Sequence, residues 1–216
     1  MAFLNCLVRY ATGRPTIQGV LNFSVQIVML GPMGRPRKFS REGVLQKALP
    51  VFWKYGFART TLPDLEQATG VNKSGLYAEF DSKEALFLAC LRHYLETRSG
   101  GELLMAEPLG WANIERFLAE APSFEVDQQG CFCVNSMREL DNLPPEARKV
   151  ILDDRARTHR LLRANLASEK PKMGVNALCE LICAFFSGIC IEANLTPDRK
   201  RARRKIRELM QMVRAA

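Results

Sequence analysis

Histidine is scarce in this sequence. Its 216 residues include two histidines, His93 and His159, and neither lies in a recognisable nucleophile motif. His159 stands among Arg155, Arg157 and Arg160, a setting typical of a solvated helix face. We therefore expect no enzymatic activity from this chain.

Long apolar runs and alternating patterns are also missing. No run reaches the roughly 18 residues that cross a bilayer, because polar residues and a glycine interrupt the most apolar early stretch, at Gly19, Asn22, Ser24 and Gln26. Strand-like alternation and internal repeats are absent. With 47% hydrophobic and 25% charged residues, the chain can bury a core. These patterns predict an all-α globular protein and no membrane partner.

Acidic residues are outnumbered by basic ones. The chain has 31 Lys and Arg against 23 Asp and Glu, which gives a net charge of +8 and a pI near 9.3. This surplus favours a polyanionic partner, either nucleic acid or an acidic membrane surface. Charge alone does not decide between these two.

The cysteines lack the regular spacing of a disulfide framework. There are seven, an odd number, in a chain long enough to fold without covalent staples: Cys6, Cys90, Cys131, Cys133, Cys179, Cys183 and Cys190. We expect reduced thiols and a cytoplasmic location.

Residues 1–32 differ in composition from the rest of the chain. Residues 16–30 are uncharged and fairly apolar, and Gly31 and Pro32 follow them. A secretory signal is one interpretation, but the basic region is weak and no small-residue cleavage site stands out. We expect instead that Met33 is the natural start and that residues 1–32 are a mis-called leader or a disordered extension.

From Ser40 onward the apolar spacing is helical. Four helices are expected before a double glycine at Gly100, with caps at Ser40, Thr61, Asn72 and the pair Asp81 and Ser82. Further helices are expected at 111–121, 131–140, 144–168, 173–194 and 197–213. The double glycine divides the chain into residues 33–99, a three-helix helix-turn-helix DNA-binding domain, and residues 100–216, a larger helical sensing and dimerisation domain.

Two of these helices, 61–68 and 72–80, are joined by a tight turn at Gly70. This arrangement has the dimensions of a helix-turn-helix, whose second helix enters the major groove of DNA. The segment "FWKYGFARTTLPDLEQATGVNKSGLYAEFDSKEALF", residues 52–87, resembles the amino-terminal domain of TetR/AcrR transcriptional repressors. The resemblance is close over residues 35–95 and implies a repressor that binds double-stranded operator DNA as a homodimer and is released by a small-molecule or metal inducer.

The first turn of the second helix carries the base-contact candidates. Lys73 offers a cation, Ser74 a hydroxyl, and Gly75 a close approach of the backbone to the groove. Tyr77 matches the phosphate-binding tyrosine of the resembled family. Tyr77 could instead be a half-buried residue that packs in the protein core.

Other residues around the motif are candidates for phosphate contacts. Thr61 can donate to a phosphate or serve only as a cap, and Lys83 can meet an anion at a helix start or be a solvated charge. A basic arm before the first helix can follow phosphates, enter the minor groove or simply solubilise the chain; it consists of Arg35, Arg37, Lys38 and Arg41.

The resemblance implies that the last two long helices form a dimeric four-helix bundle. The apolar residues expected at that interface are Leu178, Ile182, Phe185, Phe186, Ile189, Ile206, Leu209 and Met210. The basic residues at 199–207 fall mostly on the opposite face of the last helix.

The sensing residues are left open by the sequence. Cys179, Cys183 and Cys190 share one edge of a helix, and Cys131 and Cys133 form a C-x-C pair that converges only in an extended segment or first turn. These thiols can pack inertly, bind Cu(I) or another thiophilic metal, or sense oxidants and electrophiles.

Two further observations bear on the inducer. The stretch "CAFFSGICIEANL", residues 183–195, resembles a copper-responsive branch of the family. If the thiols only pack, an organic inducer touching Trp111, Phe117 and Phe132 is the alternative. No cofactor is required in either case.

A different class of function also fits the composition. The basic carboxy-terminal helix could serve a helical protein that binds membrane surfaces or partners without sequence-specific DNA binding. Heparin binding without sequence-selective DNA protection would favour that alternative.

Overall fold

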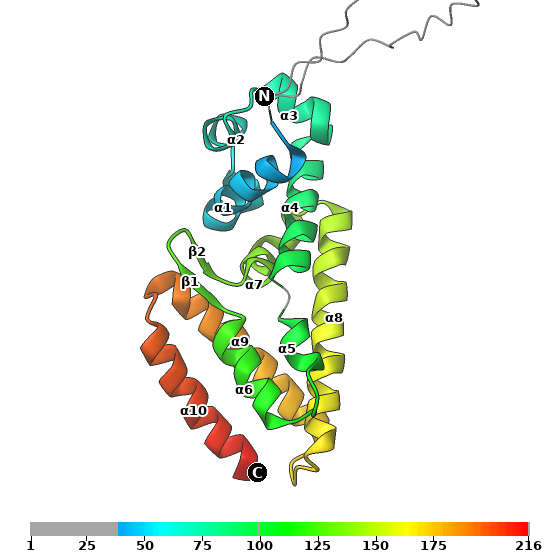
Figure 1. Ribbon diagram of the computed structural model, residues 1–216, viewed down its shortest axis with the longest axis vertical. Helices are drawn as coiled ribbons and strands as arrows, with labels where there is room; N and C mark the ends of the chain where they lie inside the picture. The colour runs from blue at the N-terminus through cyan, green and yellow to red at the C-terminus, as the bar shows by residue number, and fades with distance from the viewer. Residues whose placement is uncertain (1–38, 99, 216) are drawn as a thin grey trace, which may run out of the picture. The chain divides into compact units, whose positions relative to one another are not determined.

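The structure is a computed structural model that describes residues 39–98 and 100–215. The described residues all belong to one compact unit. Helices dominate this unit (Figure 1), which confirms the all-α prediction.

The elements follow the predicted order closely. The amino-terminal helices are α1 (Arg41–Arg59), α2 (Leu62–Thr69), α3 (Lys73–Phe80) and α4 (Lys83–Thr97). They are followed by α5 (Gly101–Met105), α6 (Trp111–Glu120), β1 (Ser123–Glu125), β2 (Gln128–Gly130), α7 (Phe132–Ser136) and the 3₁₀ helix η1 (Met137–Asn142). The long carboxy-terminal helices are α8 (Pro145–Ser168), α9 (Val175–Leu195) and α10 (Arg199–Ala215).

All four predicted amino-terminal caps are confirmed. The side chains of Ser40, Thr61, Asn72 and Ser82 each accept a hydrogen bond from the backbone N–H three residues further on. Each bond satisfies one of the free N–H groups at a helix start. Local sequence therefore sets where the first four helices begin.

Two predictions about residues 121–142 were wrong. The sequence indicated no strands, but β1 and β2 form a short antiparallel hairpin in which Ser123 pairs with Gly130. Asp127, at φ 63°, makes its turn, and these strands are too short for alternation to be visible. The helix expected at 131–140 ends at Ser136 and is followed by the 3₁₀ helix η1, which is interrupted at Glu139 (φ −125°).

The buried residues form two clusters. One joins α1–α4 to α7, with Phe132 packed between Trp53 and Tyr94 at ring-centroid distances of 5.6 and 5.8 Å. The other lies among α5, α6, α8, α9 and α10, around Leu162 and Ile182. The first cluster thus contains residues from both sides of the domain boundary predicted at residues 99–100. The division into two domains stays a prediction.

α9 is the most apolar helix of the described part of the chain. By length and composition it could cross a membrane, and 33% of its most apolar stretch is buried. One face packs into the protein through Leu178, Ile182 and Ile189, which are at most 4% exposed. Apolar residues on another face of α9 are exposed, among them Leu181 and Leu195.

Candidate functional site

α2 and α3 form the predicted helix-turn-helix. Gly70 ends α2 in the left-handed conformation at φ 72°, and Asn72 caps α3 two residues later. A non-glycine residue would be strained at that φ. Leu65 and Leu76 are buried, so the two helices are held against the amino-terminal core at a fixed angle.

The first turn of α3 presents polar side chains to solvent. Lys73 and Ser74 are exposed, and the Ser74 hydroxyl donates to Asn72 Oδ1 over 3.1 Å. The Lys73 ammonium lies 5.8 Å from the ring centroid of half-buried Tyr77. These three predicted DNA-binding residues therefore share one surface at the start of α3, with donors suited to base edges and phosphates.

Gly75 lies where neighbouring side chains of the protein leave little room for a Cβ atom. A Cβ at this position would lie 2.8 Å from Val71 Cγ1 and 3.1 Å from Asn72 Oδ1. The turn that precedes α3 therefore needs glycine for its own packing. A close approach to DNA at Gly75 stays a prediction.

Thr61 and Lys83 are engaged within the chain. The Thr61 hydroxyl donates to Asp64 Oδ2 over 2.6 Å, and this bond, with one from the Thr61 N–H, lowers the pKa of Asp64. The Lys83 ammonium donates to the carbonyls of Phe57 and Thr60, over 3.0 Å each. In this conformation both donors serve helix ends, and their predicted phosphate contacts remain untested.

The basic arm lies largely outside the described residues, which begin after Arg35, Arg37 and Lys38. Arg41 is the first described basic residue. Its guanidinium donates to the Glu79 carbonyl over 2.8 Å and lies 4.3 Å from the Phe80 ring centroid. Arg41 thereby ties the start of α1 to the end of α3.

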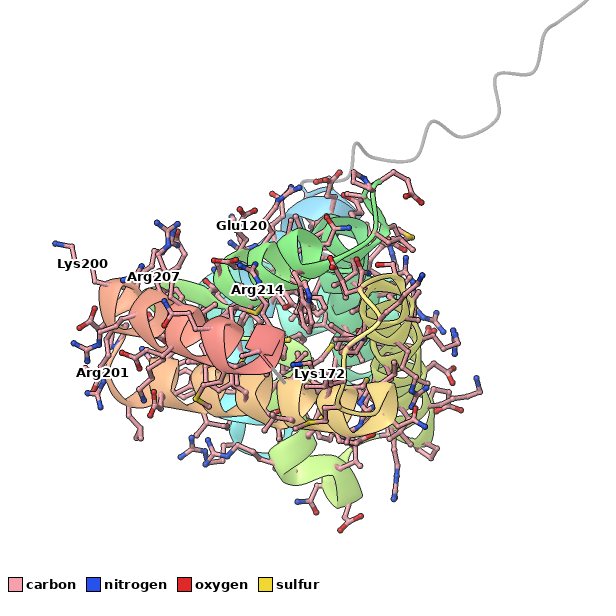
Figure 2. All side chains as sticks on the ribbon, turned by 90° about the horizontal axis from the view of Figure 1, so that it is seen from below. Glu120, Lys172, Lys200, Arg201, Arg207 and Arg214 are labelled. Carbon is pink, nitrogen blue, oxygen red and sulfur yellow. The ribbon has the colours of Figure 1, made fainter. Side chains whose placement is uncertain are left out.

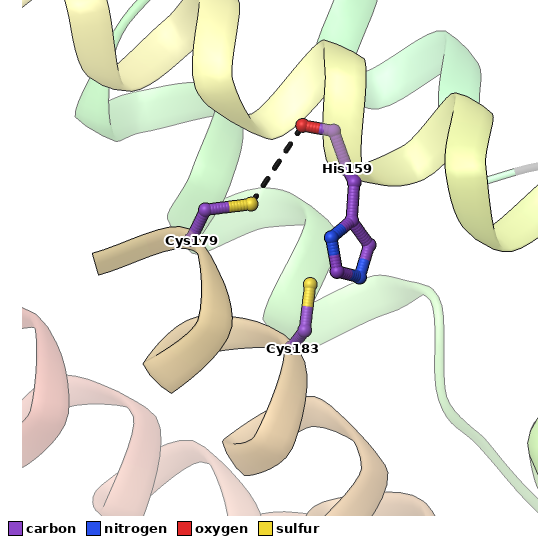
Figure 3. Close-up of side chains that lie close together, drawn as sticks. All are labelled: His159, Cys179 and Cys183. Atoms are coloured by element: carbon purple, nitrogen blue, oxygen red, sulfur yellow. Dashed lines mark hydrogen bonds between the residues drawn. The ribbon is translucent and has the colours of Figure 1, made fainter. Parts of the chain in front are cut away.

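The predicted cysteine seam on α9 is divided between two places. Cys179 and Cys183 face α8, where one ligand atom from each and one from His159 all lie within 4.8 Å of one another (Figure 3). Cys190 is about three turns further along α9 and belongs to the other cluster. The five predicted thiols therefore do not share one site.

His159 corrects a prediction. Its side chain is 12% exposed, and its Nδ1 lies 3.4 Å from Glu180 Oε1 of α9. The expectation of a solvated histidine was wrong because α9 packs over this position of α8. No local pattern signals this contact, since α8 and α9 meet only in the fold.

The two thiols beside His159 are neutral in the free protein. Burial raises the pKa of Cys179, and burial followed by the proximity of Cys179 raises the pKa of Cys183 to about 12. The Cys179 thiol donates to the His159 carbonyl over 3.7 Å (Figure 3). Neutral thiols here are poor nucleophiles.

Cys131 and Cys133 lie close together because the backbone at Cys131 is extended, which is one of the two conformations in which we expected the C-x-C pair to converge. Cys131 precedes α7 in an extended conformation, and Tyr94 donates its hydroxyl proton to the Cys131 sulfur over 3.3 Å. The Cys133 thiol, and then Tyr94, lower the pKa of Cys131 to about 7, although burial opposes them. Cys131 is 9% exposed, so this acidic thiol is shielded from bulky reagents.

The three aromatic residues offered for an organic inducer lie apart. Phe117 stacks on Phe186 at 4.7 Å, with half-buried Trp111 in the same cluster, whereas Phe132 belongs to the amino-terminal cluster. A cavity of about 50 Å³ borders Phe117, Phe186 and Tyr94. Pockets for drug-sized ligands typically have 300–1,000 Å³.

Most residues expected at the dimer interface are already covered within one chain. Six of them are at most 5% exposed: Leu178, Ile182, Ile189, Ile206, Leu209 and Met210. Phe185 and Phe186 are half-buried, and Phe186 packs on Phe117. The intrachain core uses the face that the sequence suggested for the partner.

A different face of α9 is open. Exposed small or apolar residues recur at spacings of four, three and four, a pattern typical of a helix–helix seam: Ala177, Leu181, Ala184 and Gly188. Leu195 continues the line and is 80% exposed. We call these five residues the α9 seam.

Comparison with known proteins identifies relatives. The family described as "Bacterial regulatory proteins, tetR family" matches residues 44–90. The HTH-type transcriptional repressor ComR of Escherichia coli K12 is 31% identical over 172 residues, which cover 74% of this chain and 82% of ComR. The repressor BdcR of the same organism is 29% identical over 120 residues, 54% of this chain and 60% of BdcR.

Solved structures agree with the sequence relatives. The TetR family regulator CifR, complexed with a 26-base-pair operator DNA, superposes with a TM-score of 0.71 at 26% identity, covering 82% of this chain and 98% of CifR. The reduced form of E. coli NemR has the same fold, with a TM-score of 0.61 at 21% identity over 78% of this chain and 95% of NemR.

Proposed function

The chain belongs to the TetR family of bacterial transcriptional regulators, and from this premise we propose how it binds and leaves its operator. It is a DNA-binding transcriptional repressor of the TetR type, from a family of regulators and not of enzymes. In this proposal α3 enters the major groove, and a homodimer places two copies of α3 on successive half-sites.

The observation that carries the proposal is the exposed start of α3. Lys73 and Ser74 stand on a helix that Gly70, Asn72 and the buried Leu76 hold in place. A rigid helix with an exposed cation and an exposed hydroxyl in its first turn can read base edges, and Tyr77 beside them can contact phosphate. CifR, which shares this fold, is complexed with double-stranded operator DNA.

Dimerisation follows from the α9 seam. Leu181 is 42% exposed, and nothing lies within 4 Å of a Cβ built on Gly188. Glycine inside a helix costs about 1 kcal/mol relative to alanine, and nothing within the described part of the chain requires it here. Close approach of a second α9 explains both the exposed leucine and the glycine.

Release from the operator is assigned to an effector bound in the carboxy-terminal half. The effector class we favour is a thiophilic metal such as copper, with no other cofactor required. Cys179 and Cys183 adjoin His159, and residues 183–195 resemble a copper-responsive branch of the family. Beside Phe117 and Phe186 the cavity measures about 50 Å³, and the lining of a cavity of about 620 Å³, which includes Trp53 and Phe132, contains neither Cys179 nor Cys183.

The membrane-surface alternative is disfavoured by α10. Figure 2 shows Lys200, Arg201 and Arg207 projecting outward from this helix. A helix that lies on a membrane needs a free apolar face, yet Ile206 and Met210 of α10 are at most 2% exposed. We therefore place the protein in the cytoplasm with the DNA that it regulates.

A selection from random-sequence duplexes tests the proposed function. We expect the wild-type protein to enrich a site with two related half-sites. Lys73→Ala should weaken binding to that site by about 1–3 kcal/mol, the value of one good base contact, while unfolding is unchanged. Lys172→Ala removes the same charge from an exposed position outside the motif and should bind as wild type does.

Two outcomes would count against the assignment. Failure to enrich any sequence would contradict sequence-specific binding. Equal binding by the Lys73→Ala and Lys172→Ala variants would remove Lys73 from the DNA interface.

A further inference from the structure

We propose that His159, Cys179 and Cys183 form a Cu(I) site between α8 and α9 that controls operator binding. The proposal has two parts, a metal site and its effect on operator binding. Only the second part rests on the proposed function, because metal binding can be measured without DNA. It adds a histidine that the sequence did not indicate and separates these two cysteines from Cys190.

The geometry is that of ligands close to a common centre. The three ligand atoms all lie within 4.8 Å of one another (Figure 3). Metal–nitrogen and metal–sulfur bonds of about 2.0–2.3 Å need only short side-chain movements from these positions. The ligands come from two helices, so a bound ion would tie α8 to α9.

His159 has a ring nitrogen prepared for a ligand. Its Nε2 is buried and has no hydrogen-bond partner among the described residues, and such unpaired buried groups are rare in proteins. Glu180 faces the other nitrogen, with 3.4 Å between Oε1 and Nδ1. A carboxylate that holds Nδ1–H leaves the Nε2 lone pair free, which is the usual support of a metal-bound histidine.

The ligand set selects a soft ion. Thiolates select Cu(I) or zinc, and zinc held by two thiolates and one imidazole needs a water as its fourth ligand. Within the described ranges 39–98 and 100–215, no fourth His, Cys, Asp or Glu joins these three ligands in the cluster. Cu(I), which accepts three ligands, is therefore the ion that this set suits.

Binding is balanced without a redox step. Each thiol loses its proton to solvent as its sulfur–copper bond forms, and the copper remains Cu(I). Two thiolates, one neutral imidazole and Cu(I) leave one net negative charge. The positive charges of Arg155 and Arg163, which act on Cys183 and Cys179 respectively, offset that charge.

The position of the site links it to the dimer. Leu181 and Ala184 of the α9 seam flank Cys183 and its helical turn. Loss of the Cys179 proton would also remove the bond from this thiol to the His159 carbonyl of α8. Copper would therefore favour a different packing of α8 on α9, and a dimer whose seam shifts can no longer match both half-sites.

The test is an anaerobic titration of the full chain with Cu(I) buffered by bathocuproine disulfonate. We expect one Cu(I) per chain in the wild type. Cys183→Ala and His159→Gln should each bind Cu(I) at least 100-fold more weakly. Glu180→Gln, at an exposed residue, should lose roughly 10- to 100-fold, as supporting groups around metal ligands do.

Matched controls separate this site from other effects. His93→Gln and Cys190→Ala change the same residue types elsewhere and should keep wild-type Cu(I) affinity. Wild-type affinity in Cys183→Ala, or no Cu(I) binding by the folded wild type, would overturn the site. Circular dichroism of each variant shows whether it is folded. If a variant at a buried ligand does not fold, Glu180→Gln, at an exposed position, still tests the site.

A second titration measures operator affinity with and without Cu(I). We expect Cu(I) to weaken operator binding by the wild type at least tenfold and to leave the Cys183→Ala variant unaffected. Copper binding without DNA release would overturn the regulatory role. Failure of the metal-free protein to select any DNA would instead contradict the proposed function and leave the metal titration as the test of the site.

Discussion

Lys83 illustrates how a single side chain can be engaged in the fold where the sequence suggested DNA. Its ammonium lies 3.0 Å from each of two carbonyls at the end of α1 and 4.5 Å from the Phe57 ring centroid. Carbonyls at a helix end carry partial negative charge and lack partners. Lys83 therefore joins the start of α4 to the end of α1.

We expect Lys83→Met to lower the free energy of unfolding by about 2 kcal/mol, because hydrogen bonds from a charged donor contribute roughly 1.5–3 kcal/mol. Methionine keeps most of the aliphatic stem. Urea unfolding against a Lys172→Met control measures the difference. Unchanged stability, with weaker and less salt-dependent DNA binding, would support the phosphate contact instead.

Residues with local partners were predictable, and those with distant partners were not. The four caps bond three residues away, so the sequence identified them correctly. The Lys83 carbonyl partners lie 26 and 23 residues earlier in the chain. The same holds for His159, whose environment exists only once α9 packs on α8.

At the scale of one element, α9 has two apolar faces with different surroundings. Leu178 and Ile182 face the core of their own chain, whereas Leu181 and Ala184 are exposed. A helix that is apolar on both sides has a broad hydrophobic pattern in its sequence. That pattern does not indicate which side packs in its own chain and which side packs on a second chain. The sequence thus predicted a dimer helix, but most of the residues it indicated for the partner are buried within the chain.

We expect Leu181→Asp to shift the protein from dimer to monomer. A carboxylate at the centre of the α9 seam would be buried without a partner, and central interface residues commonly contribute about 2 kcal/mol or more. Sedimentation velocity over a range of concentrations measures the change.

Met105→Asp is the control for that substitution. Met105 is 46% exposed on α5, close to the 42% of Leu181, and lies outside the α9 seam. Its variant should remain dimeric. A dimer of unchanged stability in the Leu181→Asp variant would show that another surface mediates assembly.

At the scale of the molecule, α1 is linked to the carboxy-terminal half of the chain through η1 and β2. Glu139 accepts hydrogen bonds from the backbone N–H groups of Phe57 and Ala58, over 2.5 and 3.0 Å, next to Gly56, where α1 is kinked at φ 79°. Trp53 donates to the Gln129 carbonyl over 2.8 Å. Movement of η1 or β2 can therefore reach α1 through direct contacts.

This linkage was outside what the sequence could predict. Helix count, order and caps follow from local patterns, whereas the shared core depends on how η1 and the β1–β2 hairpin meet α1. Packing continues across the double glycine at Gly100. DNA binding was predictable because the α2–α3 motif is local, whereas repression was predicted only from the resemblance to the TetR/AcrR family.

Operator recognition, as proposed, requires two copies of α3 on one dimer to read two half-sites together. An anisotropy titration can compare the selected operator with the same operator carrying about five base pairs inserted between its half-sites, half a helical turn. We predict that the insertion reduces affinity to the level of non-specific DNA, roughly 10³-fold or more below the operator. Equal affinity for the two duplexes would contradict paired reading by the dimer.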